Sequence, residues 1–555
     1  MAGIKSLKGD RSLRGDIQAG LVLGIQSVPD GLATGVLAGL NPMNGLYAYI
    51  VGSAAGAAFT SSTMMVVQAT GAMAMVISDV PAVHGGNDQA RALATLSLLT
   101  GVVMLIAGFL KLGSLLRFVS NAVLVGFMSA VGVNIILGQV ANLTGYAAPG
   151  DNRVIRTVNT ILSPTSIHWQ SLIIGLATIA LIVLLEHTPI GSFGLVVAVV
   201  VTSVLVPILG WTDVATLHDL GFQVTAAIQW TLPSIAHVPA LLVPAASLAF
   251  IALVQGAGIS AMYAKADGQR PDVSRDFIGQ GVANAATALT AGMPVGGSAS
   301  ASALNAAAGA KTRRAPMIAA LVMILVVIVF GSAVDYLAMP ALAGLLILVG
   351  YRTIRPADIQ SVWKAGNVQK AVLVVTFALT MFVPLQYAVL VGVGVSVVLH
   401  VVQQSNQVTV RRRMKNEAGD TIEVDPPKEV PAGEVVVLQP YGSLFFASAP
   451  VFEEALPAIT ATSTGSVVII RLRGRVELGT TFVDVLARYA VELEAAGSRL
   501  FIVSVASGVM RQLKTGGVLD AVGDDGIFLG DERVGAALVQ AESAAEVWIA
   551  QQPPR

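Results

Sequence analysis

A short polar segment interrupts the apolar sequence between residues 292 and 305. It begins Gly-Met-Pro-Val-Gly-Gly, which breaks a helix, and then carries the polar side chains of Ser298, Ser300, Ser302 and Asn305. At membrane depth, non-helical backbone is tolerated only where protein or a water-filled cavity satisfies its hydrogen bonds. Transporters use such breaks to aim the positive N-terminal end of a half-helix at a bound solute. We therefore predict that these four side chains bind an anionic or polar ligand.

A second polar segment, residues 60–71, reads TSSTMMVVQATG and is also rich in small side chains. Gln68 and Thr70 would open a second half-helix there, opposite the first. Gln255, in a later apolar segment, has an amide that both donates and accepts hydrogen bonds. Small polar side chains also mediate helix packing in membranes. For the two glutamines, and for the last two side chains of the first segment, the sequence leaves packing and ligand binding open.

A lone acid is the third feature. Asp30 is the only carboxylate that we find well inside an apolar segment, and we expect no Lys or Arg at comparable depth. A charge in hydrocarbon is costly, so burial favours the neutral form of a carboxyl group. Asp30 could therefore carry a proton, or bind Na⁺ together with backbone carbonyls, as the coupling ion. The alternative is that the helix breaks at Pro29 and that Asp30 only caps the next stretch.

Composition assigns these features to a membrane protein. Apolar residues make up 54% of the chain and charged residues 12%, and mean hydropathy is +0.75. The formal net charge is +0, so no basic field suggests a nucleic-acid partner. The chain has no Cys, its six His are scattered without metal-ligand spacing, and no nucleophile lies in a recognisable pattern with a base. We predict no enzyme, and no cofactor other than H⁺ or Na⁺ as a coupling ion.

Fourteen apolar segments of about 20 residues or fewer account for residues 15–410. They begin near Asp16, Gly45, Met65, Ala92, Val119, Leu172, Gly194, Pro244, Phe277, Ser298, Ala315, Ala333, Val368 and Leu385. Lys and Arg gather in alternate loops, which places both termini in the cytoplasm. Residues 1–14 are interpreted as a cytoplasmic leader rather than a signal peptide. We therefore expect a multi-pass protein in the lipid bilayer of the cell membrane.

The segments divide into two sets of seven with opposite topology, in which the third and the tenth correspond. Interrupted segments in matching positions of two halves indicate a transport site. We therefore predict an α-helical membrane protein, a 7+7 inverted-repeat transporter. Residues 411–432 are polar and Pro-bearing, as in a linker. Residues 433–555 alternate β-rich apolar runs with helical patterns, so we predict a small cytosolic α/β domain there.

These stretches resemble the SulP anion transporters. Residues 14–48 resemble the family's first two spans, through RGDIQAGL, LAGLNP and GLYA. Residues 268–281 contain GQRPD and IGQG and resemble the loop before its ninth span. Residues 294–312, PVGGSASASALN followed by GAKT, resemble its tenth span, and residues 433–555 are similar to a STAS domain. The resemblance implies an inverted repeat with a core domain that moves against a gate domain, a homodimer, and a solute held between the third and tenth half-helices.

The sequence departs from that family at the site itself. The family usually has a neutral polar residue at Asp30, an acid at Gln255 and an Arg at Ala301, and its third half-helix opens with Gly-Pro rather than Gln68-Ala69. The site therefore lacks its usual cation and has an additional acid. The family's sulfate-type substrate does not carry over directly.

Together, these features predict a secondary active transporter of a small anion, either inorganic or a carboxylate. It would be coupled to H⁺ or Na⁺ through Asp30 and would work by alternating access between core and gate. The alternatives are an uncoupled anion channel, a carrier of a neutral solute such as a nucleobase, and a membrane-anchored signalling scaffold. The costly polar breaks weigh against the scaffold, because a scaffold does not need them.

Overall fold

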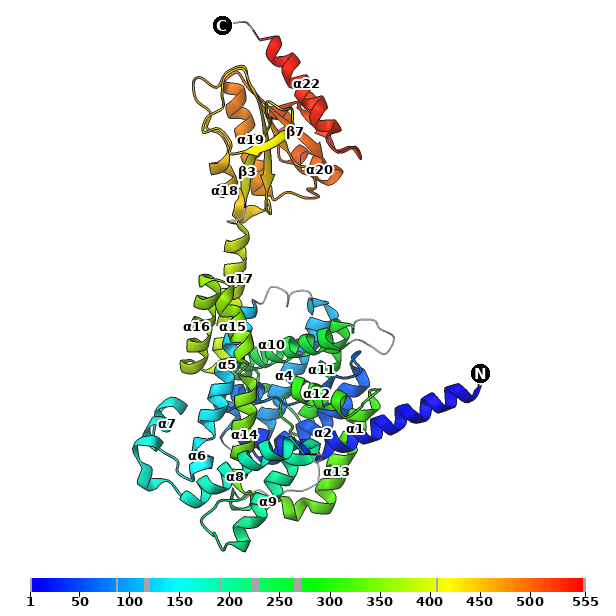
Figure 1. Ribbon diagram of the computed structural model, residues 1–555, viewed down its shortest axis with the longest axis vertical. Coiled ribbons are helices and arrows are strands. Elements are labelled where there is room, and N and C mark those ends of the chain that lie inside the picture. Colours follow the sequence, from blue (N-terminus) through cyan, green and yellow to red (C-terminus); the bar gives the residue numbers. More distant parts are fainter. Residues whose placement is uncertain are drawn as a thin grey trace. The chain divides into compact units, whose positions relative to one another are not determined.

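The chain forms two compact units, Met1–Ser396 and Val397–Arg555, called here the membrane unit and the C-terminal unit (Figure 1). A computed structural model describes residues 2–85, 88–113, 120–188, 191–220, 230–263, 271–405 and 408–552. Part of the GQRPD motif and residues 221–229 of one predicted outer loop lie outside the described residues. The two units are considered separately below.

Helices make up nearly all of the membrane unit. The first half contains α1 (Ala2–Leu37), α2 (Pro42–Phe59), α3 (Gly71–Ser78), α4 (Gln89–Phe109), α5 (Asn121–Gly138), α6 (Val140–Thr144), α7 (Arg153–Leu162), α8 (Trp169–Glu186) and α9 (Gly194–Ile208). The second half contains α10 (Val238–Met262), α11 (Val273–Ala288), α12 (Ala299–Ala307), α13 (Arg314–Val334), α14 (Met339–Thr353), α15 (Pro356–Ala365), α16 (Asn367–Phe382) and α17 (Leu385–Ser405).

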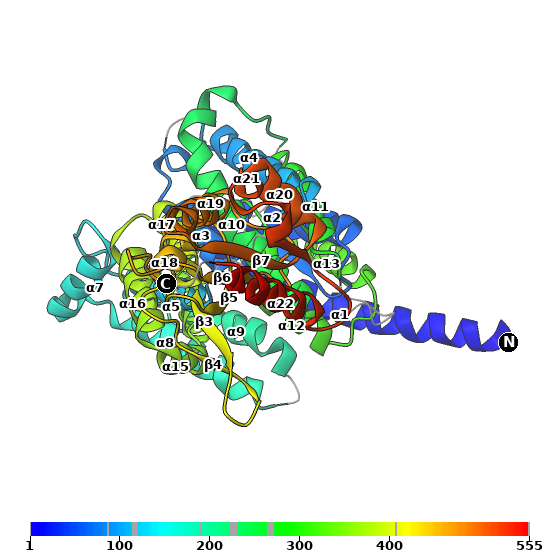
Figure 2. The same ribbon diagram turned by 90° about the horizontal axis from the view of Figure 1, so that it is seen from above.

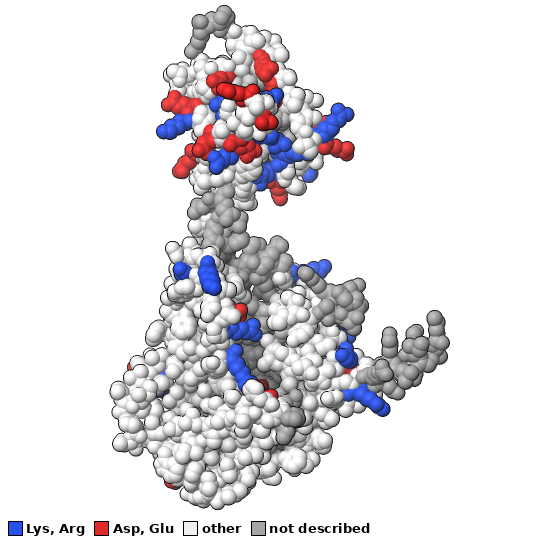
Figure 3. All heavy atoms as spheres, in the orientation of Figure 1, with Lys and Arg blue, Asp and Glu red and all other residues white. Residues whose placement is uncertain are grey.

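Several of these helices have the length and composition of membrane spans. In the described part of the chain six qualify: Ser12–Leu37, Gln89–Phe109, Asn121–Thr144, Trp169–Glu186, Ile235–Met262 and Arg314–Val334. Few charged side chains lie on the face of the membrane unit in Figure 3, whereas the C-terminal unit is rich in them. Each of the fourteen predicted segments overlaps a helix or half-helix, but the twelfth begins at Met339 rather than near Ala333. The number of full spans stays a prediction.

Two short strands replace helix at the predicted breaks. β1 (Val66–Gln68) and β2 (Gly296–Ser298) pair antiparallel, with Val66 opposite Ser298. This pairing satisfies backbone groups that apolar surroundings would leave without partners. α3 and α12 begin directly after the two strands, capped by the side chains of Thr70 and Ser298. The half-helices that the sequence predicts are therefore present.

The glycines of the second break allow a close approach to α10. A Cβ on Gly296 would lie 2.3 Å from the Ala252 Cβ, and one on Gly297 would lie 2.8 Å from the Gly256 Cα. Side chains of α11 hold the same segment, because Gln280 accepts from the Gly297 N–H at 2.9 Å and Asn284 from the Val295 N–H at 2.9 Å. The second break is thus fixed on two sides.

The membrane helices form two groups. In the core group, α1–α4 with α10–α13, α1 packs on α13 while α10 packs on α4, and α4 and α2 both pack on α11. In the gate group, α5–α9 with α14–α16, α5 packs on α14 and α16 and α8 packs on α14. The reciprocal packing of α1 on α13 and of α10 on α4 is the pattern that two repeats of seven segments produce.

The C-terminal unit contains a six-stranded sheet of order β4-β3-β5-β6-β7-β8. Its strands are β3 (Thr409–Lys415), β4 (Thr421–Val424), β5 (Val435–Tyr441), β6 (Val467–Arg471), β7 (Arg499–Val505) and β8 (Ile527–Leu529). Its helices are α18 (Ala449–Ala455), α19 (Thr480–Ala495), α20 (Ser507–Thr515), α21 (Val518–Val522) and α22 (Ala536–Ala550). α22 covers one face of the sheet (Figure 2), and α19 lies on the other.

The structure corrects the predicted linker at residues 411–432. β3 and β4 form a hairpin in this segment, and β3 pairs with β5 of the sheet. The polar composition misled the prediction, because Arg411, Arg412 and Arg413 lie near one edge of the sheet, where charged side chains reach water. The α/β domain therefore begins before residue 433.

Candidate functional site

A cavity of about 1050 Å³ lies between the core group and the gate group. The core group contributes residues from α1, α10 and both half-helices, and the gate group contributes residues from α5 and α14. Thr70 and Ser298, which cap α3 and α12, both line it. The positive ends of two half-helices therefore face one cavity, an arrangement that favours a negatively charged or polar ligand.

Asp30 lines the cavity from the middle of α1. α1 continues unbroken through Pro29 to Leu37, so the alternative that Asp30 caps a new helix is wrong. The Tyr49 hydroxyl donates to Asp30 Oδ2 at 2.8 Å. Thr34 Oγ1 donates to the Asp30 carbonyl oxygen at 2.7 Å and lies 3.2 Å from Tyr49 Oη. The carboxyl group thus belongs to a small hydroxyl cluster at the cavity wall.

The first half-helix contributes Gln68 and Thr70, and both line the cavity. Gln68 is buried, and its Nε2 donates to Ser27 Oγ at 3.0 Å and to Ser53 Oγ at 3.2 Å. Both donor hydrogens of the amide are engaged in these bonds, so Gln68 fixes β1 against α1 and α2. Thr70 accepts from the Met73 N–H at 3.4 Å.

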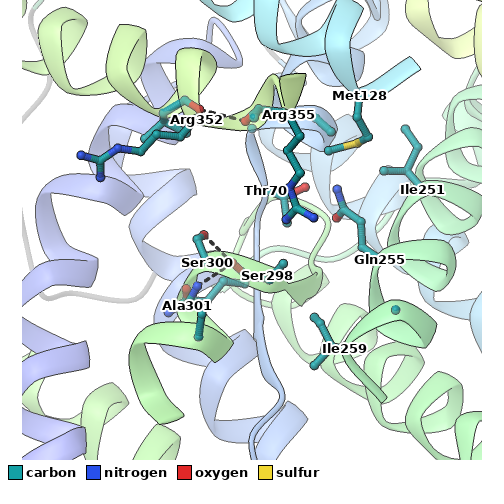
Figure 4. A pocket seen from close by; sticks show the side chains of 18 of the residues that line it. Thr70, Met128, Ile251, Gln255, Ile259, Ser298, Ser300, Ala301, Arg352 and Arg355 are labelled. Atoms are coloured by element: carbon teal, nitrogen blue, oxygen red, sulfur yellow. Dashed lines mark hydrogen bonds between the residues drawn. The ribbon is translucent and has the colours of Figure 1, made fainter. Parts of the chain in front are cut away.

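The second half-helix separates its four predicted site residues into two pairs. Ser298 and Ser300 line the cavity, with their Oγ atoms 3.3 Å apart (Figure 4). Ser302 and Asn305 are buried away from it. Ser302 Oγ accepts from the Val66 N–H at 3.0 Å, and Asn305 Nδ2 donates to the Met64 carbonyl oxygen at 3.4 Å. Ser302 thus holds the strand β1, and Asn305 holds the segment just before it. For these two side chains the structure favours packing, one of the two alternatives that the sequence left open.

Gln255 lines the cavity from α10, as expected. Its side chain lies close to those of Met128 and Ile251 in Figure 4. Its Oε1 is buried and has no hydrogen-bond partner among the described residues. An amide with unused hydrogen-bonding capacity at a cavity wall is available to a ligand.

Sequence reasoning missed the cations of the cavity. Arg352 and Arg355 line it, together with Glu186 and Asp358. The site residues predicted from the sequence did not include these two arginines. Both arginines belong to a polar stretch between two apolar segments, which the sequence presents as an ordinary loop. Their approach to the cavity depends on how α14 packs against α5, and a sequence pattern does not report that packing.

Comparison with known proteins places this arrangement in a family. The model of the "Sulfate permease family" matches residues 13–379, and that of the "STAS domain" matches residues 427–530. "Probable sulfate transporter MT1781" of Mycobacterium tuberculosis is 28% identical over 538 residues, which cover 94% of each chain. "Bicarbonate transporter BicA" of Picosynechococcus sp. is 25% identical over 454 residues, 79% of each chain.

A solved structure has the same fold. The structure of SLC26A9 aligns with a TM-score of 0.83 at 18% identity and covers 98% of this chain and 92% of its own. The relatives' names describe transporters and not enzymes. The resemblance to SulP transporters is thus confirmed: the chain belongs to the sulfate permease family of membrane anion transporters and carries a C-terminal STAS domain.

Proposed function

We propose that this protein is a secondary active transporter that carries a small anion together with a proton. The anion would be inorganic or a carboxylate, and transport would proceed by movement of the core group against the gate group. The names of the relatives, which describe sulfate and bicarbonate transporters, support an anion as the substrate. The cavity supports it too, because Thr70, Ser298 and Ser300 converge there with two half-helix N-termini.

The hydrogen bonds around Asp30 are the observation that carries the proton proposal. Three contacts connect Asp30, Tyr49 and Thr34, at 2.8, 3.2 and 2.7 Å. When Asp30 is ionised, the two hydroxyl hydrogens can serve only two of these three contacts. A proton on Asp30 supplies the third hydrogen. The carboxyl group then donates to Tyr49, Tyr49 donates to Thr34, and Thr34 donates to the backbone. Each contact has its own hydrogen only in the protonated form.

Electrostatics would couple this proton to the anion. Asp30 lines the same cavity as the half-helix N-termini, and two negative charges repel strongly where little water screens them. Anion binding therefore favours protonation of Asp30, and protonation favours anion binding by the same factor, because coupling between two sites is reciprocal. The core group would then move with the anion and the proton bound at the same time, as symport requires.

Na⁺ is the other coupling ion that the sequence allows. A Na⁺ ion at Asp30 would have to displace the Tyr49 hydroxyl hydrogen from Oδ2, whereas a proton on Asp30 gives each of the three contacts described above its own hydrogen. We therefore propose H⁺ rather than Na⁺. We further propose that the protein is a homodimer in the cell membrane with both termini in the cytoplasm. The cavity would then open to the cytoplasm, since the positive-inside rule assigns Arg352 and Arg355 to that side.

Uptake into proteoliposomes tests the proposal. Labelled sulfate, bicarbonate and succinate would be offered under an inward proton gradient, an inward Na⁺ gradient or no gradient. We expect accumulation of at least one anion with the proton gradient, and none by the Asp30→Asn variant, which would still exchange anion for anion. Accumulation with Na⁺ alone would assign Na⁺ as the coupling ion. Equilibration without accumulation would indicate a channel. Full accumulation by Asp30→Asn would contradict the role of Asp30.

A further inference from the structure

The cations of the cavity come from the gate group. Among its described lining residues the core group supplies one charged side chain, Asp30, whereas Arg352 and Arg355 come from α14 and from its junction with α15. An anion attracted to the half-helices therefore meets neutral donors on the core side. Any cation that neutralises it must extend across the cavity from the gate.

The two arginines differ in their partners. Arg352 forms an ion pair with Glu186, and in Figure 4 its side chain extends away from Thr70 and Ser298. Arg355 Nη1 lies 3.9 Å from Asp358 Oδ2, with the two side chains 64% and 48% exposed. Exposed pairs at that separation contribute little to stability. The charge of Arg355 is therefore available to a ligand, while that of Arg352 is already paired.

The backbone around Arg355 is constrained. It lies between the end of α14 and Pro356, with φ −107° and ψ 96°, and a residue before proline is confined to such extended conformations. α14 itself is held close to α5, because a Cβ on Gly350 would lie 2.8 Å from the Gly132 carbonyl oxygen. Figure 4 shows the Arg355 side chain extending toward Thr70 and Gln255.

We propose that Arg355 is the cation that binds the transported anion, and that it does so from the gate side. This inference rests on the proposed anion transport. The guanidinium would bind two oxygens of a carboxylate or oxyanion, a geometry that an ammonium group does not offer. The hydroxyls and N–H groups at Thr70 and Ser298 would bind the same anion from the core. The anion then contacts both the core group and the gate group, which move against each other in the proposed transport, and Arg355 selects oxyanions with two adjacent oxygens.

Binding measurements on the purified full-length protein test this. Isothermal titration with sodium sulfate and with sodium succinate would compare the parent with Arg355→Gln. We expect Arg355→Gln to lower affinity about 10- to 100-fold, the loss typical of a charge-assisted hydrogen bond. Arg355→Lys should fall between the two, because it keeps the charge and loses the paired donors. Ala301, on α12, lines the same cavity, so adding Ala301→Arg to Arg355→Gln should restore much of the affinity.

A matched control separates this role from the loss of any arginine that lines the cavity. The double variant Glu186→Gln with Arg352→Gln removes a paired lining cation without changing net charge, and should bind within about threefold of the parent. Arg355→Gln affinity equal to that of the parent, or a loss equal to that of the control, would overturn the proposal for Arg355. Lack of binding of either anion to the parent would instead contradict the proposed function. Size-exclusion profiles establish folding, and Arg355→Lys decides the question if Arg355→Gln does not fold.

Discussion

Tyr49 is the residue that most directly tests the hydroxyl cluster beside Asp30. Tyr49→Phe keeps the ring and removes the hydroxyl that contacts both Asp30 and Thr34. Leaving such partners unsatisfied costs about 1–3 kcal/mol, so we expect proton-driven accumulation to fall about tenfold while anion exchange stays within about threefold. Tyr47→Phe is the control, because Tyr47 is buried nearby in α2 and does not line the cavity. Equal effects of the two substitutions would contradict a specific role for Tyr49.

The residues at the cavity were only partly predictable. Asp30 and Ser298 were found because a carboxylate and a serine-rich break are unusual within apolar sequence. Ser302 faces β1 instead, because α12 lies beside that strand and a three-residue strand has no recognisable pattern. Arg355 was missed because a loop cation satisfies the positive-inside rule wherever its side chain points.

At the scale of elements, α3 extends from the cavity at one end to a contact with elements outside the core group at its other end. Its N-terminal end carries Thr70, and its C-terminal cap is Asp79. Asp79 Oδ1 lies 2.6 Å from Arg153 Nη2 of α7, and Oδ2 accepts from the Leu385 N–H at the start of α17 at 3.1 Å. This contact holds α3 to elements outside the core group, at the end of α3 away from the cavity. In the proposed movement of the core group against the gate group, this contact would break.

Asp79→Asn should therefore shift the balance of conformations. Breaking a partly buried ion pair costs about 1–3 kcal/mol, so the ratio of the conformation in this structure to the alternative conformation should fall about tenfold. The chain has no Cys, so Ser300→Cys gives a clean reporter, and its labelling from the cavity side should slow in Asp79→Asn. Asp88→Asn is the control, because Asp88 contacts His237 within the core group. Unchanged labelling in Asp79→Asn would show that this contact does not stabilise the conformation.

The elements themselves were more predictable than the residues. Long apolar runs such as 314–334 are recognisable as membrane helices from their composition. The breaks at β1 and β2 are recognisable from their polar and small residues, with Pro and Gly at the second break. The hairpin of β3 and β4 was not predicted, because edge strands carry charged side chains and resemble a linker. The position of α14 at the cavity could not be predicted. It depends on tertiary contacts between helices, and sequence periodicity does not report which helices contact each other.

At the scale of the whole molecule, the two units have separate hydrophobic cores. Deletion of residues 408–555 should leave a membrane unit that folds and binds sulfate within about threefold of the parent, since the cavity residues all precede residue 396. Deletion from Pro431 should behave worse, because it retains β3 without β5 and exposes an unpaired strand edge. Size-exclusion profiles and titration would compare them. Loss of binding in a well-folded 1–407 protein would show that the C-terminal unit contributes to the site.

The central claim is that one proton on Asp30 accompanies the anion, and calorimetry can count that proton. Anion binding measured near neutral pH in buffers of different ionisation enthalpy gives the number of protons taken up per anion. We predict uptake approaching one proton in the parent at a pH where Asp30 is ionised in the empty protein, and none in Asp30→Asn, which should still bind the anion. Zero uptake by the parent at every pH tested, or equal uptake by the parent and Asp30→Asn, would contradict the account.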